Sequence, residues 1–152
     1  MNNPEMQCMT REHLRQVHNI ESECFAIPWS YDSFEEELEN PLAIYLVAMV
    51  GGEVAGFAGM HHVVDEGNIT NIAVRRQYRG QGIGGALVRG LCDIAAAKKI
   101  AKMTLEVRVG NHIAFRLYGR HGFTFAGIRK NYYVDTKEDA IVMWKEFGEV
   151  AQ

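Results

Sequence analysis

The sequence has few cysteines and prolines, no long apolar run and no large excess of either charge. Three widely spaced cysteines among 152 residues argue against a disulfide framework and favour reduced thiols. No apolar run approaches the roughly 18 residues of a membrane-spanning helix, and the first residues lack the layout of a signal peptide. A net charge of −3 gives no basic footprint for nucleic acid. We therefore expect a cytoplasmic protein with neither a membrane nor a nucleic-acid partner.

Metal-ligand spacing is also missing. The six histidines form no motif, and the adjacent His61 and His62 would point to opposite faces of a strand. We expect no metal site. The length and the 47% hydrophobic content predict a single domain over residues 1–152 with one substantial core. The sequence does not determine the oligomeric state.

The most informative segment present is a glycine-rich turn between a strand and a helix. A β-branched strand over 69–74 is followed by Arg79-Gly80-Gln81-Gly82-Ile83-Gly84 and then by an apolar helical run. Such a turn exposes unpaired backbone N–H groups and the positive end of the helix dipole. It therefore predicts a site for an anion such as pyrophosphate, which glycines allow the backbone to approach closely.

Two familiar phosphate-binding motifs fit this turn poorly. A Walker loop needs Lys followed by Ser or Thr, and neither pair occurs here. A dinucleotide fingerprint matches Gly80, Gly82 and Gly85, with Glu106 near the distance expected of its acidic residue. However, more than half of the chain precedes the turn, so no second mononucleotide-binding half fits behind it. Arg79 also favours an anion with more phosphate than a dinucleotide has.

The segments after the turn give more specific evidence of function than the turn itself. The strand over 102–108 alternates, with Leu105 and its apolar neighbours on one face and Glu106 on the other. Asn111 is a good N-cap and Gly122 a good C-terminal residue for a short helix over 111–121. In order, these segments read R-x-x-G-x-G, a strand, then N-x-x-A-x-x-L-Y-x-x-x-G-F.

This combination resembles the GCN5-related N-acetyltransferase (GNAT) superfamily. The segments Pro28-Trp29-Ser30, Asn71-Ile72-Ala73-Val74, Leu105-Glu106-Val107-Arg108 and Arg129-Lys130-Asn131-Tyr132-Tyr133 look like its ribosomal-protein-alanine N-acetyltransferases, the RimI type. The likeness extends over about residues 6 to 146. Gly110, where that type commonly has Ser, and Arg75-Arg76, where Pro is frequent, depart from the pattern in loops only.

The hydrophobic pattern predicts the order of the elements. After a first strand, we expect helices over 12–23 and from Ser30 or Asp32 to 39, then strands over 43–50, 53–64 and 69–74. A helix over 82–98, a strand over 102–108, a helix over 111–121 and strands near 124–133 and 139–146 complete the chain. The fold class is α/β (α+β mixed). The resemblance implies a mixed, mostly antiparallel sheet of about seven strands, helices on both faces and a splayed, V-shaped acetyl-CoA cleft.

The resemblance also implies the chemistry. Acetyl transfer to an amine needs a base, a stabilised oxyanion and a proton for the departing thiolate. These roles fall to Glu106, to a backbone N–H near residues 72–74, and to Tyr118. Glu106 could instead be a solvated strand residue, which is less expected if both faces of the sheet are covered. Tyr118 could instead be a core aromatic residue.

The coenzyme would be acetyl-CoA, as co-substrate. Its pantetheine arm would pair with the strand edge and its pyrophosphate would lie on the glycine turn, with a further contact from the helix N-cap. The residues so assigned are Ile72, Ala73, Val74, Arg79, Gly80, Gln81, Gly82, Ile83, Gly84, Gly85 and Asn111.

The acceptor is the least determined part. An α-amine has a reference pKa of about 7.7–8.0 against about 10.4 for lysine, so one modest base suits a protein N-terminus better. The resemblance implies the N-terminal alanine of a small-subunit ribosomal protein. Trp29, Tyr31, Tyr132 and Tyr133 are candidates for flanking that peptide, and equally for core or hairpin aromatics. Two alternatives stay open: acetylation of lysine side chains or small amines, and a non-catalytic acyl-CoA-binding module.

Overall fold

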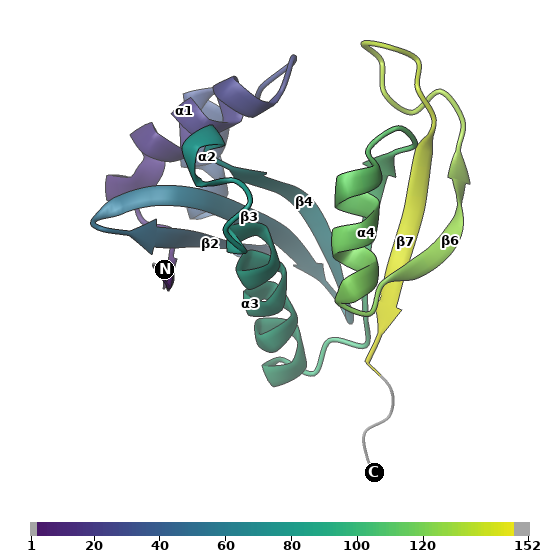
Figure 1. Cartoon of the computed structure of the whole chain (residues 1–152). Coiled ribbons are helices and arrows are strands. Elements are labelled where there is room, and N and C mark those ends of the chain that lie inside the picture. Colours follow the sequence, from purple (N-terminus) through teal and green to yellow (C-terminus); the bar gives the residue numbers. More distant parts are fainter. Residues whose placement is uncertain (1–2, 148–152) are drawn as a thin grey trace.

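The computed structural model describes residues 3–147, and a single seven-stranded sheet runs through them in the order β1-β2-β3-β4-β5-β7-β6 (Figure 1). The strands are β1 (Glu5–Cys8), β2 (Ala43–Val50), β3 (Glu53–Val63), β4 (Glu66–Val74), β5 (Lys102–Arg108), β6 (Thr124–Arg129) and β7 (Ala140–Glu146). The helices are α1 (Leu14–Cys24), α2 (Tyr31–Glu39), α3 (Ile83–Ala97) and α4 (His112–Arg120), with short 3₁₀ turns η1 (Arg11–His13) and η2 (Arg76–Tyr78). Only β4 and β5 pair in parallel. The expected mixed, mostly antiparallel sheet is confirmed.

Local sequence signals explain most element boundaries. Leu14, Val17 and Ile20 form the fully buried stripe of α1, as their helical spacing predicts. The Ser30 hydroxyl accepts a hydrogen bond from the Ser33 N–H at 3.1 Å and caps α2. The β2–β3 hairpin turns at Gly51 and Gly52, both with positive φ.

Two boundaries differ from those expected. β4 begins at Glu66 because the turn is made one step earlier, at Val64 and Asp65, with Val64 at φ 58°. β6 ends at Arg129, not near residue 133, and a loop follows to residue 139. Asn131 in that loop has φ 52°, and its N–H donates to the Asp139 side chain at 2.9 Å. The Asn131 N–H therefore bonds a side chain and not the backbone of a neighbouring strand, and β6 ends before this residue.

Helices cover the two halves of the sheet differently (Figure 1). α1 and α2 pack on one face of β2–β4 through a core that includes Phe34, Val47 and Phe57, and α3 packs on the opposite face through Leu87 and Leu91. α4 covers β5, β7 and β6 on the α3 side. On the other face of those strands, Trp144 is 37% exposed and Thr124 is exposed. The expectation that both faces are covered therefore holds at β2–β4, whereas the outer face of β7 and β6 is partly open and the outward side chains of β5 are half-buried.

The sheet splits between β4 and β5. These strands pair only where Glu66–Asn68 lie beside Lys102–Thr104, and beyond that point β5 pairs with β7 alone. Residues 69–74 of β4 therefore have an open edge toward the gap seen in the middle of Figure 1. This split gives the V shape that the resemblance implied.

Candidate active site

The open edge of β4 presents backbone groups to the gap. Arg75 N–H donates to Ala55 O at 2.7 Å, and Ala73 lies opposite Phe57 in the same register. Backbone groups alternate in direction along a strand, so the N–H groups of Ile72 and Val74 point away from β3, into the gap. An extended ligand with amides can pair there as an added strand would.

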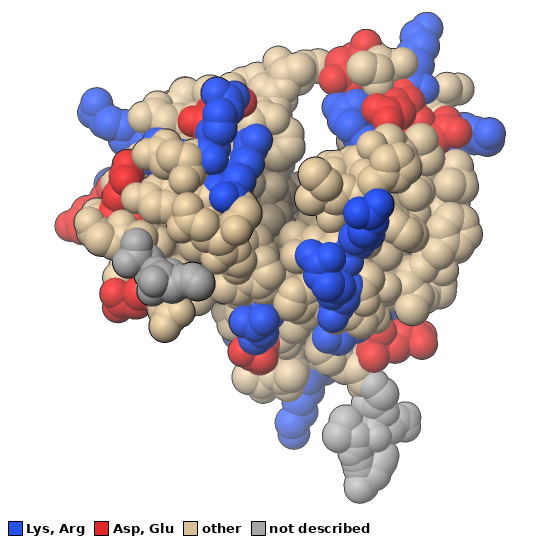
Figure 2. Space-filling model, viewed as in Figure 1, with Lys and Arg blue, Asp and Glu red and all other residues tan. Residues whose placement is uncertain are grey.

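The glycine turn lies at the N-terminus of α3. Gly80 and Gly82 have φ of 77° and 83°, left-handed conformations that favour glycine, and Gly82 is the N-cap residue of the helix. Among the described residues, no hydrogen-bond partner occurs for the N–H groups of residues 80–85. Figure 2 shows the surface hollowed between the α3 and α4 sides, with Lys and Arg side chains on both sides of the hollow. Free N–H groups, a helix N-terminus and nearby cations together suit a polyanionic ligand.

Arg79 joins this turn to the strand edge. Its Nε donates to the Val74 carbonyl oxygen at 3.1 Å, and its Nη2 donates to Cys24 Sγ at 3.1 Å. The guanidinium therefore points back toward the end of β4, not freely over the turn. Burial raises the pKa of the Cys24 thiol, so this thiol is neutral at physiological pH.

Glu106 lies on β5 beyond the split, on the face opposite the apolar Leu105 and Val107. Its side chain is 26% exposed, and its Oε2 lies 3.3 Å from Arg129 Nε. The other carboxylate oxygen has no ion-pair partner among the described residues. A carboxylate held by one oxygen, with the other free beside a gap, can accept a proton from an amine.

Tyr118 reaches the same corner from α4. It is 9% exposed and packs edge-on against Phe123, with ring centroids 5.8 Å apart. Burial raises the pKa of Tyr118, and Tyr133 adds to that rise. Burial likewise raises the pKa of Tyr133 to about 12, while the charge of Glu106 contributes to the same rise. Glu106 and Tyr118 therefore both interact electrostatically with Tyr133. The Tyr118 hydroxyl stays neutral across the physiological pH range.

Asn111 caps α4 as expected. Its Oδ1 accepts from Ala114 N–H at 3.1 Å, and the residue is exposed at the β5–α4 turn. Its amide nitrogen has no described partner and is free for a ligand.

The aromatic candidates lie in or directly after two loops, one before α2 and one between β6 and β7, at one end of the molecule and on opposite sides of the gap (Figure 1). Trp29 is half-buried, with its ring centroid 5.4 Å from that of Phe34, and Tyr31, at the start of α2, is 37% exposed. Across the gap, Tyr132 is 45% exposed and meets Tyr133 edge-on at 5.0 Å. Trp29 thus also contributes to the core, whereas Tyr31 and Tyr132 offer mostly free surface.

Two charged residues near this end were not singled out from the sequence. Glu21 on α1 is only 3% exposed and accepts hydrogen bonds from Trp29 N–H and from the Asn71 amide. A signal for it existed, because Glu21 lies four residues after Val17 on the apolar stripe of α1. Arg108 on β5 lies with its Cζ 4.0 Å from the Tyr133 ring centroid and pairs with Asp135 at 3.0 Å. Nothing in the local sequence indicates that partner.

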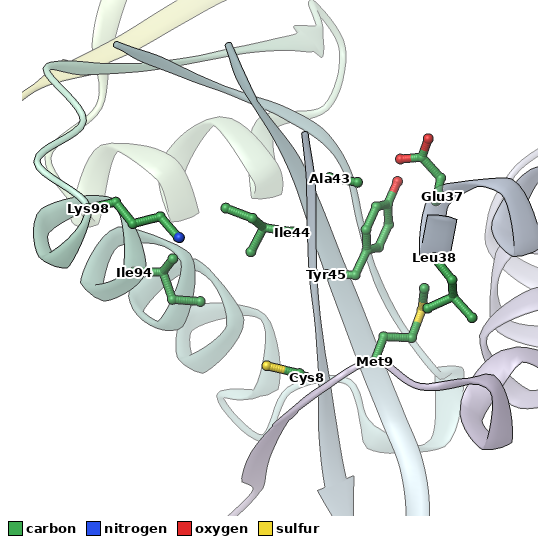
Figure 3. Close-up of a pocket in the computed structure, with 9 residues that line it drawn as sticks. All are labelled: Cys8, Met9, Glu37, Leu38, Ala43, Ile44, Tyr45, Ile94 and Lys98. Carbon is green, nitrogen blue, oxygen red and sulfur yellow. The ribbon is translucent and has the colours of Figure 1, made fainter. Parts of the chain in front are cut away.

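A separate cavity of about 410 Å³ lies at the far edge of the sheet, where β1 ends (Figure 3). Ile44, Ile94 and Lys98 lie on the α3 side of β2, and Tyr45 and Leu38 lie on the α2 side. It shares no residue with the split between β4 and β5. Within residues 3–147, no cluster of His, Cys, Asp and Glu could hold a metal ion, and no helix is long and apolar enough to cross a membrane.

Known proteins are similar to this chain in sequence and in structure. Residues 14–123 match the acetyltransferase (GNAT) family. A Bacillus subtilis (strain 168) protein, provisionally named a ribosomal protein bS18-alanine N-acetyltransferase, is 45% identical over 142 residues, 93% of this chain and 94% of its own. The Escherichia coli (strain K12) ribosomal protein bS18-alanine N-acetyltransferase is 40% identical over 133 residues, 86% of this chain and 88% of its own. A crystal structure of the Escherichia coli ribosomal-protein-S18-alanine N-acetyltransferase superposes with a TM-score of 0.90 at 34% identity, covering 100% of this chain and 97% of that one.

Proposed function

This chain belongs to the acetyltransferase (GNAT) family, and we propose that it transfers the acetyl group of acetyl-CoA to the α-amine of the N-terminal alanine of ribosomal protein bS18. The observation that supports the reaction is the open edge of β4 beside a glycine turn with free N–H groups, which suits the arm and the pyrophosphate of the coenzyme. The acceptor is proposed from relatives that share 40–45% of their residues over nearly the whole chain.

In the proposed mechanism, Glu106 accepts the proton of the acceptor amine, directly or through one water molecule. The amine nitrogen attacks the thioester carbonyl, and the N–H groups of Ile72 and Val74 stabilise the resulting oxyanion. When the tetrahedral intermediate collapses, the carbon–sulfur bond breaks and the amide forms. Tyr118 then gives its proton to the departing thiolate, whose conjugate thiol has a pKa of about 8.5.

The remaining assignments complete the coenzyme and acceptor sites. The N–H groups of residues 80–85 would hold the pyrophosphate, and Arg79 would add positive charge beside them. Ala73 would help to shape the strand edge, and Asn111 would contact the coenzyme through its free amide nitrogen. The two aromatic loops would enclose the acceptor peptide, with Trp29 and Tyr31 on one side and Tyr132 and Tyr133 on the other.

The test is to incubate the purified protein with acetyl-CoA and a peptide copying the bS18 N-terminus, beside a copy that is blocked at its α-amine but keeps its lysines. Mass spectrometry locates any acetyl group. We expect acetylation of the free α-amine only, lost in Glu106→Gln. Acetylation of the blocked copy would move the acceptor to lysine. Inactivity on both, with coenzyme binding intact, would favour a small amine or a binding module.

A further inference from the structure

Glu21 is a buried carboxylate to which the proposed mechanism gives no part. It is 3% exposed, and no Lys, Arg or His side chain among the described residues lies within ion-pair distance of it. Placing an ionisable side chain in such a position costs free energy unless hydrogen bonds satisfy it. Its two oxygens are satisfied by two different segments of the chain.

One of those segments is the loop between α1 and α2. Glu21 Oε2 accepts from Trp29 N–H at 3.0 Å, near the end of the loop. The backbone oxygen of the same residue accepts from Phe25 N–H at 3.0 Å, at the start of the loop. Glu21 therefore holds both ends of the loop over residues 25–29, in which Phe25 and Ile27 are exposed.

The other segment is the strand that offers the oxyanion donors. Glu21 Oε1 accepts from Asn71 Nδ2 at 3.3 Å, and Asn71 directly precedes Ile72. Asn71 Oδ1 accepts in turn from the Thr70 hydroxyl at 2.9 Å, and Thr70 lies 3.2 Å from the Tyr45 hydroxyl. A β-bulge in β4 falls at this point, so these polar contacts fix the strand where its regular ladder is interrupted.

From these contacts we infer that Glu21 is a positioning residue, which fixes the acceptor-side loop of residues 25–29 to β4 beside the oxyanion donors. The two carboxylate oxygens serve both donors at once. Without this side chain, the loop is still held by the packing of Trp29 on Phe34, but it loses the hydrogen bonds that connect it to β4. This inference rests on the proposed acetyl transfer to a peptide α-amine, and the coenzyme site does not depend on it.

Three variants test the inference by steady-state kinetics with the bS18 peptide and acetyl-CoA. Glu21→Ala removes both acceptors and should raise KM for the peptide by about tenfold, with the Kd of acetyl-CoA unchanged. Glu21→Gln keeps one acceptor for Trp29 N–H, and Asn71 can turn its amide to match, so this variant should stay within about threefold of the parent. Glu36→Ala, at an exposed carboxylate on α2, is the matched control and should leave both constants unchanged.

A second measurement does not depend on turnover. The chain has two tryptophans, so Trp144→Phe leaves Trp29 as the only indole reporter. In that background Glu21→Ala should shift the Trp29 emission to longer wavelength, as the loop moves into water, and Glu21→Gln should not. If the alanine variant fails to fold, Glu21→Asp, which keeps the charge but shortens the reach, takes its place.

The outcomes separate the two proposals. An unchanged peptide KM and unchanged Trp29 emission in Glu21→Ala would overturn the positioning role. A fall in kcat in Glu21→Gln as deep as in Glu21→Ala would also overturn it, because the carboxylate would then act as a proton acceptor. If the parent protein acetylates no peptide but Glu21→Ala still shifts the Trp29 emission, the proposed acceptor is wrong. The role of Glu21 in fixing the loop to β4 would then still hold.

Discussion

At the scale of single residues, two glutamates near the candidate site have different surroundings. Glu106 and Glu21 are both carboxylates, but Glu106 is partly exposed beside Arg129, whereas Glu21 is buried and has no described cation within ion-pair distance. Burial raises the pKa of Glu21, and the hydrogen bonds from Trp29 and Asn71 oppose that rise. The proposed base is therefore the partly solvated carboxylate, whereas the buried carboxylate is held by its hydrogen-bond partners.

Tyr118→Phe tests the proton donor. The ring is buried and packs on Phe123, so phenylalanine keeps the packing and removes only the hydroxyl. If Tyr118 protonates the thiolate, kcat should fall by at least about 100-fold, the usual contribution of a general acid. The measurement is kcat with the bS18 peptide, together with calorimetric binding of acetyl-CoA, which should not change. An equal loss of coenzyme binding would instead assign Tyr118 to the cleft wall.

The raised pKa of Glu21 predicts that the stability of the protein depends on pH, and the variant Glu21→Gln tests this. Because the pKa of Glu21 in the folded protein is raised above its ordinary value of 4.5, the folded state binds more protons than the unfolded state between those two values. This residue's contribution to stability is therefore largest below pH 4.5 and is lost as pH rises through the raised pKa. Urea unfolding from pH 4.5 to 7 should show the parent losing free energy of unfolding relative to the variant. Parallel curves would contradict the raised pKa.

At the scale of elements, the reacting groups lie at the ends of strands and helices. The edge of β4, the N-terminus of α3, the polar face of β5 and the last turns of α4 meet at one gap. The proposed coenzyme side is built from strands, helices and the short glycine turn, whereas the proposed acceptor side consists mainly of two longer loops (Figure 1). We therefore expect coenzyme binding to depend on backbone conformation, and acceptor binding to depend on the contacts that hold the loops.

Gly82→Ala tests the glycine turn. At φ 83° an alanine is strained by about 1–2 kcal/mol, and its Cβ would have no described neighbour within 4 Å, so the strain should displace the free N–H groups and weaken acetyl-CoA binding. Gly52→Ala is the matched control, with φ 80°, equally open space and a position in the β2–β3 hairpin, outside the residues proposed to bind the coenzyme. Both variants should lose similar stability, and only Gly82→Ala should raise the calorimetric Kd of acetyl-CoA. Equal Kd values would remove the turn from the coenzyme site.

Arg108→Lys tests the second acceptor loop. Arg108 bonds Asp135 through Nη2 at 3.0 and 3.1 Å and Glu138 through Nη1 at 3.4 Å, and it stacks on Tyr133. Lysine keeps the charge but loses the planar fork, so the loop should loosen and the peptide KM should rise by about tenfold. Arg11→Lys, at an exposed pair with Glu35, is the control and should have no effect. A peptide KM unchanged in Arg108→Lys would show that Tyr133 is held without this contact.

At the scale of the whole molecule, one sheet is divided into two halves. β4 and β5 share only three residue pairs, Glu66 with Lys102, Gly67 with Met103 and Asn68 with Thr104. A ligand seated in the split would contact both halves and should stabilise the folded state through binding alone.

We expect acetyl-CoA at about 100 times its Kd to add about 2.7 kcal/mol, which for a domain of this size raises the melting temperature by about 5–11 °C. Differential scanning calorimetry with and without acetyl-CoA measures this shift. NADH at the same concentration is the control, because it tests the dinucleotide alternative for the same turn. A larger shift with NADH would overturn the proposed coenzyme.

The sequence by itself determined the elements and their chemical character. Periodicity located the helices and most of the strands, although β4 and β6 each differ at one end. The capping residues Ser30 and Asn111 could be identified from the local sequence, and the glycine turn indicated an anion site. These features depend on neighbours in the chain, and the family resemblance added the roles of Glu106 and Tyr118, which stay predictions.

Only the tertiary structure decided which distant residues meet. The split beyond Asn68, the partly open outer face of β7 and β6, the return of Arg79 to Val74 and the burial of Glu21 depend on strand pairing and packing. Arg108 with Asp135 and Glu21 with Asn71 are separated by 27 and 50 residues. Pairs so far apart leave no periodic trace in one sequence, because long-range contacts are fixed by the sheet that brings their strands together.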